Sequence, residues 1–112
     1  MNTVLEQLTA TLESRKTADP DSSYVASLHR QGLNKILEKV GEEATEVILA
    51  AKDVAVGGER DAVTNEVADL WFHTMVMLSH LDMDSSEVTA CLGRRFGISG
   101  LEEKASRSQR EE

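Results

Sequence analysis

The sequence predicts an all-α domain, a bundle of four to five helices built around an antiparallel helix hairpin. Three observations support this class: one proline among 112 residues, glycines that mostly separate segments, and apolar residues that recur every three or four positions. No segment alternates apolar and polar residues as a half-buried strand does. The length suits a single domain over residues 1–112.

The first predicted helix runs from about residue 3 to residue 16, because its apolar residues share one face: Val4, Leu5, Leu8 and Leu12. Residues 17–23 hold the only proline and are predicted to form a loop. A short helix should then begin near Tyr24, since either Ser22 or Ser23 can cap its first turn and Gly32 can end it.

Two long helices form the centre of the predicted fold. The first covers residues 33–55 and carries this apolar face: Leu33, Ile36, Leu37, Val40, Ala44, Val47, Ile48, Ala51, Val54 and Ala55. The second starts near Glu59, after Gly57-Gly58, with these residues on one side: Val63, Val67, Leu70, Trp71, Thr74, Met77, Leu78 and Leu81. So short a connection predicts that the two helices pack as an antiparallel hairpin.

A last helix is predicted to open at the capping box of Asp84 and Glu87 and to stop at Gly97. Its apolar face holds Val88, Cys91, Leu92 and Phe96, so the Cys91 thiol is expected to be buried. The polar tail is expected to lose order from about residue 105.

Charge and composition exclude several classes of protein. A net charge of -8 and a pI near 4.8 argue against a general binder of nucleic acid or of anionic membranes. No apolar run approaches the ~20 residues that span a bilayer. One cysteine cannot form an intramolecular disulfide, and residues 1–6 lack the pattern of a signal peptide, so a cytoplasmic protein is expected.

Four carboxylates are predicted to meet beside the hairpin. Glu43 and Glu46 lie one turn apart on one flank of the first long helix, and Glu66 and Asp69 lie on the matching flank of the second. Antiparallel packing brings these flanks to the same side. Glu46, Glu66 and Asp69 have no basic residue at contact positions on their own helix, and a cluster of oxygen ligands suits Mg²⁺, with Mn²⁺ as a substitute. The alternative is an ordinary solvated set of helix charges.

The spacing Glu42-Glu43-x-x-Glu46 and then Glu66-x-x-Asp69 resembles the metal-binding pattern of the MazG-like superfamily of all-helical nucleoside triphosphate pyrophosphohydrolases. Further segments extend the resemblance to the phosphoribosyl-ATP pyrophosphohydrolase family over nearly the whole chain: Arg15-Lys16, Asp19-Pro20, Ser23-Tyr24 and residues 39–46, 66–73 and 95–107. The pair Trp71-Phe72 departs from this family, in which an aliphatic residue followed by Tyr is expected.

The resemblance implies a MazG-like bundle that hydrolyses phosphoribosyl-ATP to phosphoribosyl-AMP and pyrophosphate with Mg²⁺, the second step of histidine biosynthesis. It implies metal ligands at Glu43, Glu46, Glu66 and Asp69, and catalytic acids at Glu42, Glu43 and Glu46, with Glu42 as a further ligand or the base that activates water. Substrate contacts are expected from Arg15, Lys16, Tyr24, Lys39, Arg95 and Lys104. His73 lies four residues after Asp69, where it can orient that ligand. Related families form dimers or larger assemblies, so a homodimer is expected.

Two other functions remain open from the residues alone. One is a housekeeping enzyme of the same superfamily that removes noncanonical or deoxynucleoside triphosphates. The other is an acidic helical adaptor that binds partner proteins without turnover. A preference for dUTP or ATP over phosphoribosyl-ATP would favour the housekeeping enzyme. An unchanged metal affinity in Glu46→Gln would favour the adaptor.

Overall fold

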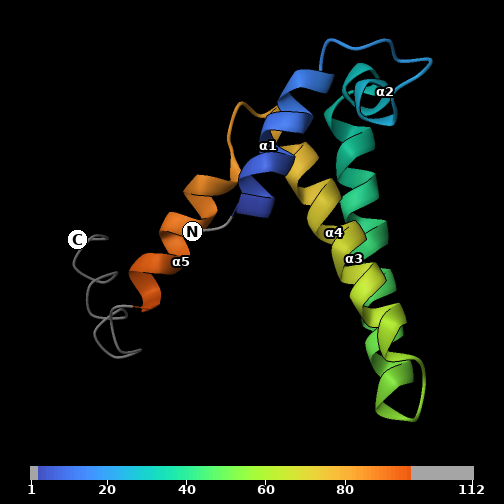
Figure 1. Cartoon of the computed structure of the whole chain (residues 1–112). Helices are drawn as coiled ribbons and strands as arrows, with labels where there is room; N and C mark the ends of the chain where they lie inside the picture. The colour runs from blue at the N-terminus through green and yellow to red at the C-terminus, as the bar shows by residue number, and fades with distance from the viewer. Residues whose placement is uncertain (1–2, 97–112) are drawn as a thin grey trace, which may run out of the picture.

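The computed structural model describes residues 3–96, which form five helices and no strand (Figure 1). The helices are α1 (Thr3–Arg15), α2 (Tyr24–Gln31), α3 (Leu33–Ala55), α4 (Arg60–His80) and α5 (Ser85–Phe96). The predicted all-helical class and the α3–α4 hairpin are confirmed. The predicted stop at Gly97 and the tail from about residue 105 lie outside the described residues. None of the described helices is long and apolar enough to cross a membrane.

The turn between α3 and α4 depends on two glycines. Gly57 has a φ of 100°, a conformation that costs glycine little and other residues much more. At Gly58 a Cβ atom would lie 2.8 Å from the carbonyl carbon and oxygen of Asp53, whose oxygen accepts a hydrogen bond of 2.7 Å from the Gly58 N–H. The chain therefore reverses within residues 56–59, and α4 returns alongside α3.

The hydrophobic core lies at the end of the hairpin where α3 begins and α4 ends. It comprises Leu12, Val25, Leu28, Ile36, Met75 and Val76, which come from α1, α2, α3 and α4. α1 and α2 cover this end, whereas the remainder of α3 and α4 extends away from them as a two-helix arm (Figure 1). The fold therefore has a closed end and an open arm.

Several residues predicted to be buried are exposed. Trp71 on α4 is 57% exposed and Ile48 on α3 is 62% exposed, no residue of α5 is buried, and Cys91 is only half-buried. The prediction of a buried Cys91 was therefore wrong. Helical periodicity identifies the apolar stripe of each helix, but α1 and α2 cover only one end of the hairpin and α5 packs mainly on α1.

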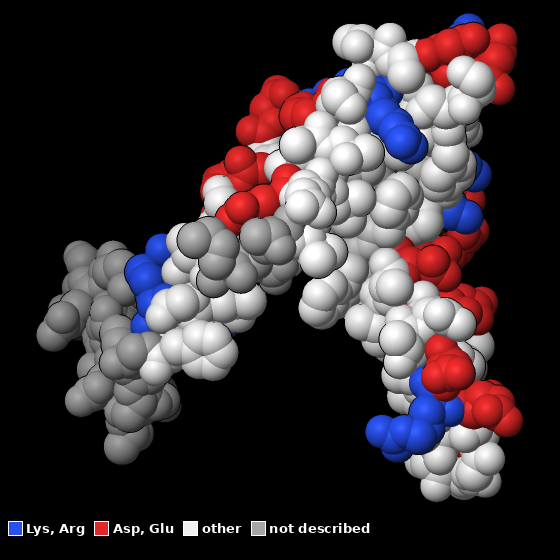
Figure 2. Space-filling model, in the orientation of Figure 1, with Lys and Arg blue, Asp and Glu red and all other residues white. Residues whose placement is uncertain are grey.

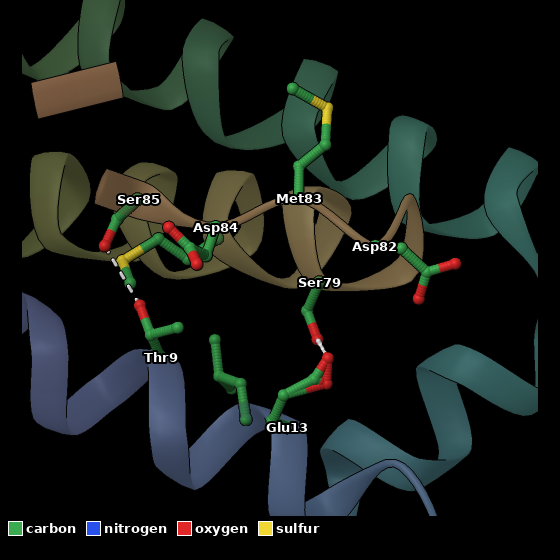
Figure 3. A pocket seen from close by; sticks show the side chains of 9 residues that line it. Thr9, Glu13, Ser79, Asp82, Met83, Asp84 and Ser85 are labelled. Atoms are coloured by element: carbon green, nitrogen blue, oxygen red, sulfur yellow. Dashed lines mark hydrogen bonds between the residues drawn. The ribbon is translucent and has the colours of Figure 1, made fainter. Parts of the chain in front are cut away.

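A small pocket of about 180 Å³ lies where α1 meets the connection between α4 and α5 (Figure 3). The hydroxyls of Thr9 and Ser85 form a hydrogen bond of 2.9 Å across it, and the Ser79 hydroxyl donates to Glu13 at 3.4 Å. Its polar side chains bond to one another, so we assign this pocket to packing of α1 rather than to catalysis.

Two histidines connect α2 to the end of α4. The Nδ1 atoms of His29 and His80 lie 2.9 Å apart, and the two rings stack with centroids 5.1 Å apart. One Nδ1 must donate and the other accept, so two imidazolium ions cannot share this contact. Burial, followed by the positive charges of His80 and Lys16, lowers the pKa of His29, while Glu13 opposes this effect. His29 Nε2 is buried without a hydrogen-bond partner among the described residues.

The His29 contact predicts a pH-dependent stability. The pKa of His29 is lower in the folded chain than in the unfolded chain. At a pH between these two pKa values the unfolded chain binds more protons, so the free energy of unfolding falls as the pH drops through this range. Thermal unfolding followed from about pH 7.5 down to about pH 5.5 should show this decline, and His29→Gln should flatten it. The exposed neighbour Arg30 supplies a control, since Arg30→Gln should keep the wild-type slope. An unchanged slope in His29→Gln would contradict the assignment.

Candidate active site

Three carboxylates from the two hairpin helices meet beside the core. One oxygen each of Glu43, Glu66 and Asp69 lies within 4.8 Å of the others, and we call this group the acid trio. Glu66 and Asp69 share a face because they lie one turn apart on α4, and Glu43 faces them from α3. Asp and Glu side chains gather in patches along the arm of α3 and α4 (Figure 2). The acid trio thus lies where the closed end of the hairpin gives way to the open arm.

The acid trio is poorly neutralised. Loss of solvation, and then the charges of Asp69, Glu46 and Glu43, raise the pKa of Glu66 above its ordinary value. No described Lys or Arg lies within 4.0 Å of a carboxylate of the trio. Like charges this close favour either proton uptake or a bound cation.

Glu46 and Glu42 take different positions from the acid trio. Glu46 is exposed and is not one of the three acids within 4.8 Å, although its charge acts on Glu66. Glu42 forms an ion pair of 3.0 Å with Lys39, and this contact lowers the pKa of Glu42 and raises that of Lys39. Helical spacing allows Lys39 to reach either Glu42 or Glu43, and the structure pairs it with Glu42.

Tyr24 and His73 lie next to the acid trio. The Tyr24 hydroxyl is 2.8 Å from His73 Nε2, and His73 Nδ1 is 2.8 Å from the backbone carbonyl oxygen of Asp69. His73 therefore contacts the backbone of Asp69, whereas the sequence suggested that it orients the carboxylate. No sequence pattern couples Tyr24 to His73, because they are 49 residues apart on different helices.

The other described basic residues expected to bind substrate form no ion pair with the acid trio. Lys16 pairs with Glu13 at 2.6 Å and with Asp82 at 3.4 Å. Asp82 follows Asp69 by 13 residues, roughly 20 Å along a helix. Arg15 is exposed at the last turn of α1 and Arg95 is exposed on α5, and Lys104 lies outside the described residues. Of the expected substrate contacts within residues 3–96, only Lys39 and Tyr24 interact electrostatically with the acid trio, through Glu43.

Comparison with known proteins relates this site to a known family. The sequence model of "Phosphoribosyl-ATP pyrophosphohydrolase" matches residues 5–96. The chain belongs to this family. A relative from Hydrogenovibrio crunogenus named phosphoribosyl-ATP pyrophosphatase is 55% identical over 108 residues, which cover 96% of each chain. Relatives of the same name from Burkholderia cenocepacia and Burkholderia vietnamiensis are 57% and 56% identical over 107 residues, covering 96% of this chain and 88% of theirs.

Membership of the phosphoribosyl-ATP pyrophosphohydrolase family makes the chain an enzyme, a hydrolase, and decides against the adaptor alternative. The matched region contains all five described helices except the first residues of α1. The acid trio, Lys39 and Tyr24 all fall within it.

Proposed function

We propose that this chain hydrolyses phosphoribosyl-ATP to phosphoribosyl-AMP and pyrophosphate, the second step of histidine biosynthesis, as a single cytoplasmic catalytic domain over residues 1–112. The observation that carries this proposal is the acid trio in a chain of the phosphoribosyl-ATP pyrophosphohydrolase family. A triphosphate needs its negative charge offset for hydrolysis, and the described part of the chain has few free cations near the trio. A divalent cation fits that requirement.

The acid trio fits Mg²⁺ in its chemistry. All its donor atoms are carboxylate oxygens, the ligands that Mg²⁺ and Mn²⁺ prefer, and the pKa of Glu66 is raised by loss of solvation and then by the neighbouring carboxylates. Glu43, Glu66 and Asp69 would hold the cation, with Glu46 as a fourth ligand. When bound, Mg²⁺ neutralises phosphate charge and lowers the pKa of water.

Lys39 and Glu42 act on the substrate beside the acid trio. Glu42 is ionised at neutral pH, and its ion pair with Lys39 holds its pKa below the ordinary value, so its carboxylate can accept a proton from the attacking water only as a weaker base than an unpaired glutamate. The Lys39 ammonium stays charged for the same reason and can donate to a phosphate oxygen. The ion pair thus places a carboxylate and an ammonium group side by side next to the acid trio.

Pyrophosphate release from purified protein tests this function. Phosphoribosyl-ATP with Mg²⁺ should be turned over with a kcat/KM well above those for ATP and dUTP measured under the same conditions. Absence of pyrophosphate from phosphoribosyl-ATP would refute the proposal. A preference for dUTP would instead assign the housekeeping activity of the related superfamily enzymes.

A homodimer is the second part of the proposal. An apolar groove of about 420 Å³ separates α4 from α5 and α1, and its lining includes Leu70, Trp71, Val88 and Leu92. The radius of gyration is 17.0 Å, against roughly 13 Å for a compact chain of about 100 residues. A second copy that covers the groove would bury this apolar surface.

The groove predicts the effect of one charge on assembly. Trp71→Glu should convert the dimer into a monomer, because a carboxylate at a dry interface loses its solvation without a partner. Light scattering coupled to size-exclusion chromatography measures the mass directly. Thr64→Glu adds the same charge to an exposed position of α4 outside the groove lining and should leave the dimer intact. A wild-type mass for Trp71→Glu would exclude this groove as the interface.

A further inference from the structure

Tyr24 is held firmly at the edge of the acid trio. It is the first residue of α2, where the Ser23 side chain accepts a hydrogen bond from the Ala26 N–H, and the neighbouring Val25 and Leu28 are buried in the core. Its ring packs near Phe72 and meets His73 edge-on, with centroids 6.4 Å and 5.8 Å away. These contacts fix where the phenolic oxygen lies.

The hydrogen bonds of His73 determine the direction of the Tyr24 proton. A backbone carbonyl oxygen only accepts, so His73 Nδ1 donates to Asp69 and carries the ring proton. In the neutral imidazole the second nitrogen then has a lone pair and accepts, so the Tyr24 hydroxyl donates to Nε2. The Tyr24 proton is thereby directed to His73, away from any ligand.

We infer, on the basis of the proposed hydrolase activity, that Tyr24 is a specificity residue that accepts a hydrogen bond from a hydroxyl or amino group of the substrate, and that His73 is the positioning residue that makes it an acceptor. Only the lone pairs of the Tyr24 oxygen remain for a ligand. Phosphate oxygens are acceptors as well, so this contact discriminates against them. Tyr24 therefore contacts the sugar or base part of the nucleotide, whereas Lys39 and the acid trio act on the phosphates.

The surroundings of Tyr24 agree with this division. Tyr24 is 52% exposed, and the loss of part of its solvation is the main cause that raises its pKa, with Glu43, Glu42 and Asp69 raising it further and Lys39 opposing them, so the phenol keeps its proton. The hydroxyl is therefore within electrostatic reach of Lys39 and of two members of the acid trio, Glu43 and Asp69. No described residue donates a hydrogen bond to the Tyr24 oxygen, which leaves its acceptor positions available.

The first test is the tautomer of His73 in the wild-type protein. Two-bond ¹⁵N–¹H correlation spectra distinguish an Nδ1–H ring from an Nε2–H ring and from an imidazolium, and the His73 signals are those lost in His73→Phe. We expect the Nδ1–H tautomer. An Nε2–H ring or an imidazolium would overturn the inference, because Nε2 would then donate to Tyr24. This readout requires no catalysis, so it stands apart from the test of the proposed function.

The second test separates the nucleoside contact from a phosphate contact. Tyr24→Phe should raise the KM for phosphoribosyl-ATP about 3- to 10-fold, the range of one neutral hydrogen bond, with a smaller change in kcat. Inhibition by pyrophosphate, which offers only phosphate oxygens, should keep its wild-type Ki. Ser27→Ala removes a hydroxyl from the same helix and should change neither constant. An equal loss of pyrophosphate inhibition in Tyr24→Phe, or an unchanged KM, would overturn the inference.

Discussion

We expect Glu66→Gln to lower kcat/KM for phosphoribosyl-ATP by about 10²- to 10³-fold, a loss typical of removing one preorganised electrostatic contact from a transition state. Glu66 belongs to the acid trio, and loss of solvation followed by the charges of Asp69, Glu46 and Glu43 raises the pKa of its carboxyl group. Gln keeps the shape of the side chain but removes the charge, so affinity for Mg²⁺ should fall as well. Calorimetric titration with Mg²⁺ alone measures that affinity without substrate.

The same substitution should have the opposite effect on stability without metal. The pKa of Glu66 is raised in the folded chain, which means that its ionised form opposes folding at neutral pH. Glu66→Gln should therefore raise the Tm of the metal-free protein and reduce the increase in Tm that Mg²⁺ produces in the wild type. A purely structural role for Glu66 would instead lower the Tm of the metal-free protein.

Asp61→Asn is the matched control for Glu66→Gln, because it neutralises an exposed carboxylate on the same helix outside the acid trio. It should leave kcat/KM, Mg²⁺ affinity and the Mg²⁺ effect on Tm close to wild type. Equal losses in Asp61→Asn and Glu66→Gln would show that overall charge, rather than the acid trio, controls activity.

Much of the fold could be predicted because its causes are local. Ser23 and Gly32 bound α2, the break at Gly57-Gly58 forces the hairpin, and the periodic apolar stripes specify α3 and α4. The meeting of Glu43 with Glu66 and Asp69 follows from the same local rules, since a tight antiparallel hairpin leaves little choice of which flanks face each other.

What could not be predicted depends on contacts between distant helices. The Tyr24–His73 and His29–His80 bonds join α2 to α4 across 49 and 51 residues, and no spacing rule relates such positions. Lys39 could reach either Glu42 or Glu43 by helical spacing, and only the packed structure shows that it pairs with Glu42. The exposure of apolar residues on α3 depends on where α1 and α2 pack, and the periodicity of α3 does not determine that position.

Two isoleucines of α3 allow this dependence to be measured. Ile36 and Ile48 lie at the two edges of the apolar face of α3, about 120° apart around the helix, and Ile36 is 0% exposed in the core whereas Ile48 is 62% exposed on the open arm. Ile36→Ala leaves a cavity among side chains from α1, α2 and α4 and should cost about 2–5 kcal/mol of unfolding free energy. Ile48→Ala should stay within about 0.5 kcal/mol of wild type, as exposed positions do.

Urea denaturation of the two variants measures this difference on one helix with one chemical change. Ile36 also affects the site. It lies one turn before Lys39 and packs the start of α3 against α2, the helix that carries Tyr24. We therefore expect the partly refilled variant Ile36→Val to cost about 0.5–1.5 kcal/mol and to retain activity. Equal destabilisation by Ile36→Ala and Ile48→Ala would mean that Ile48 is packed as completely as Ile36. The description of the arm of α3 and α4 as open would then be wrong.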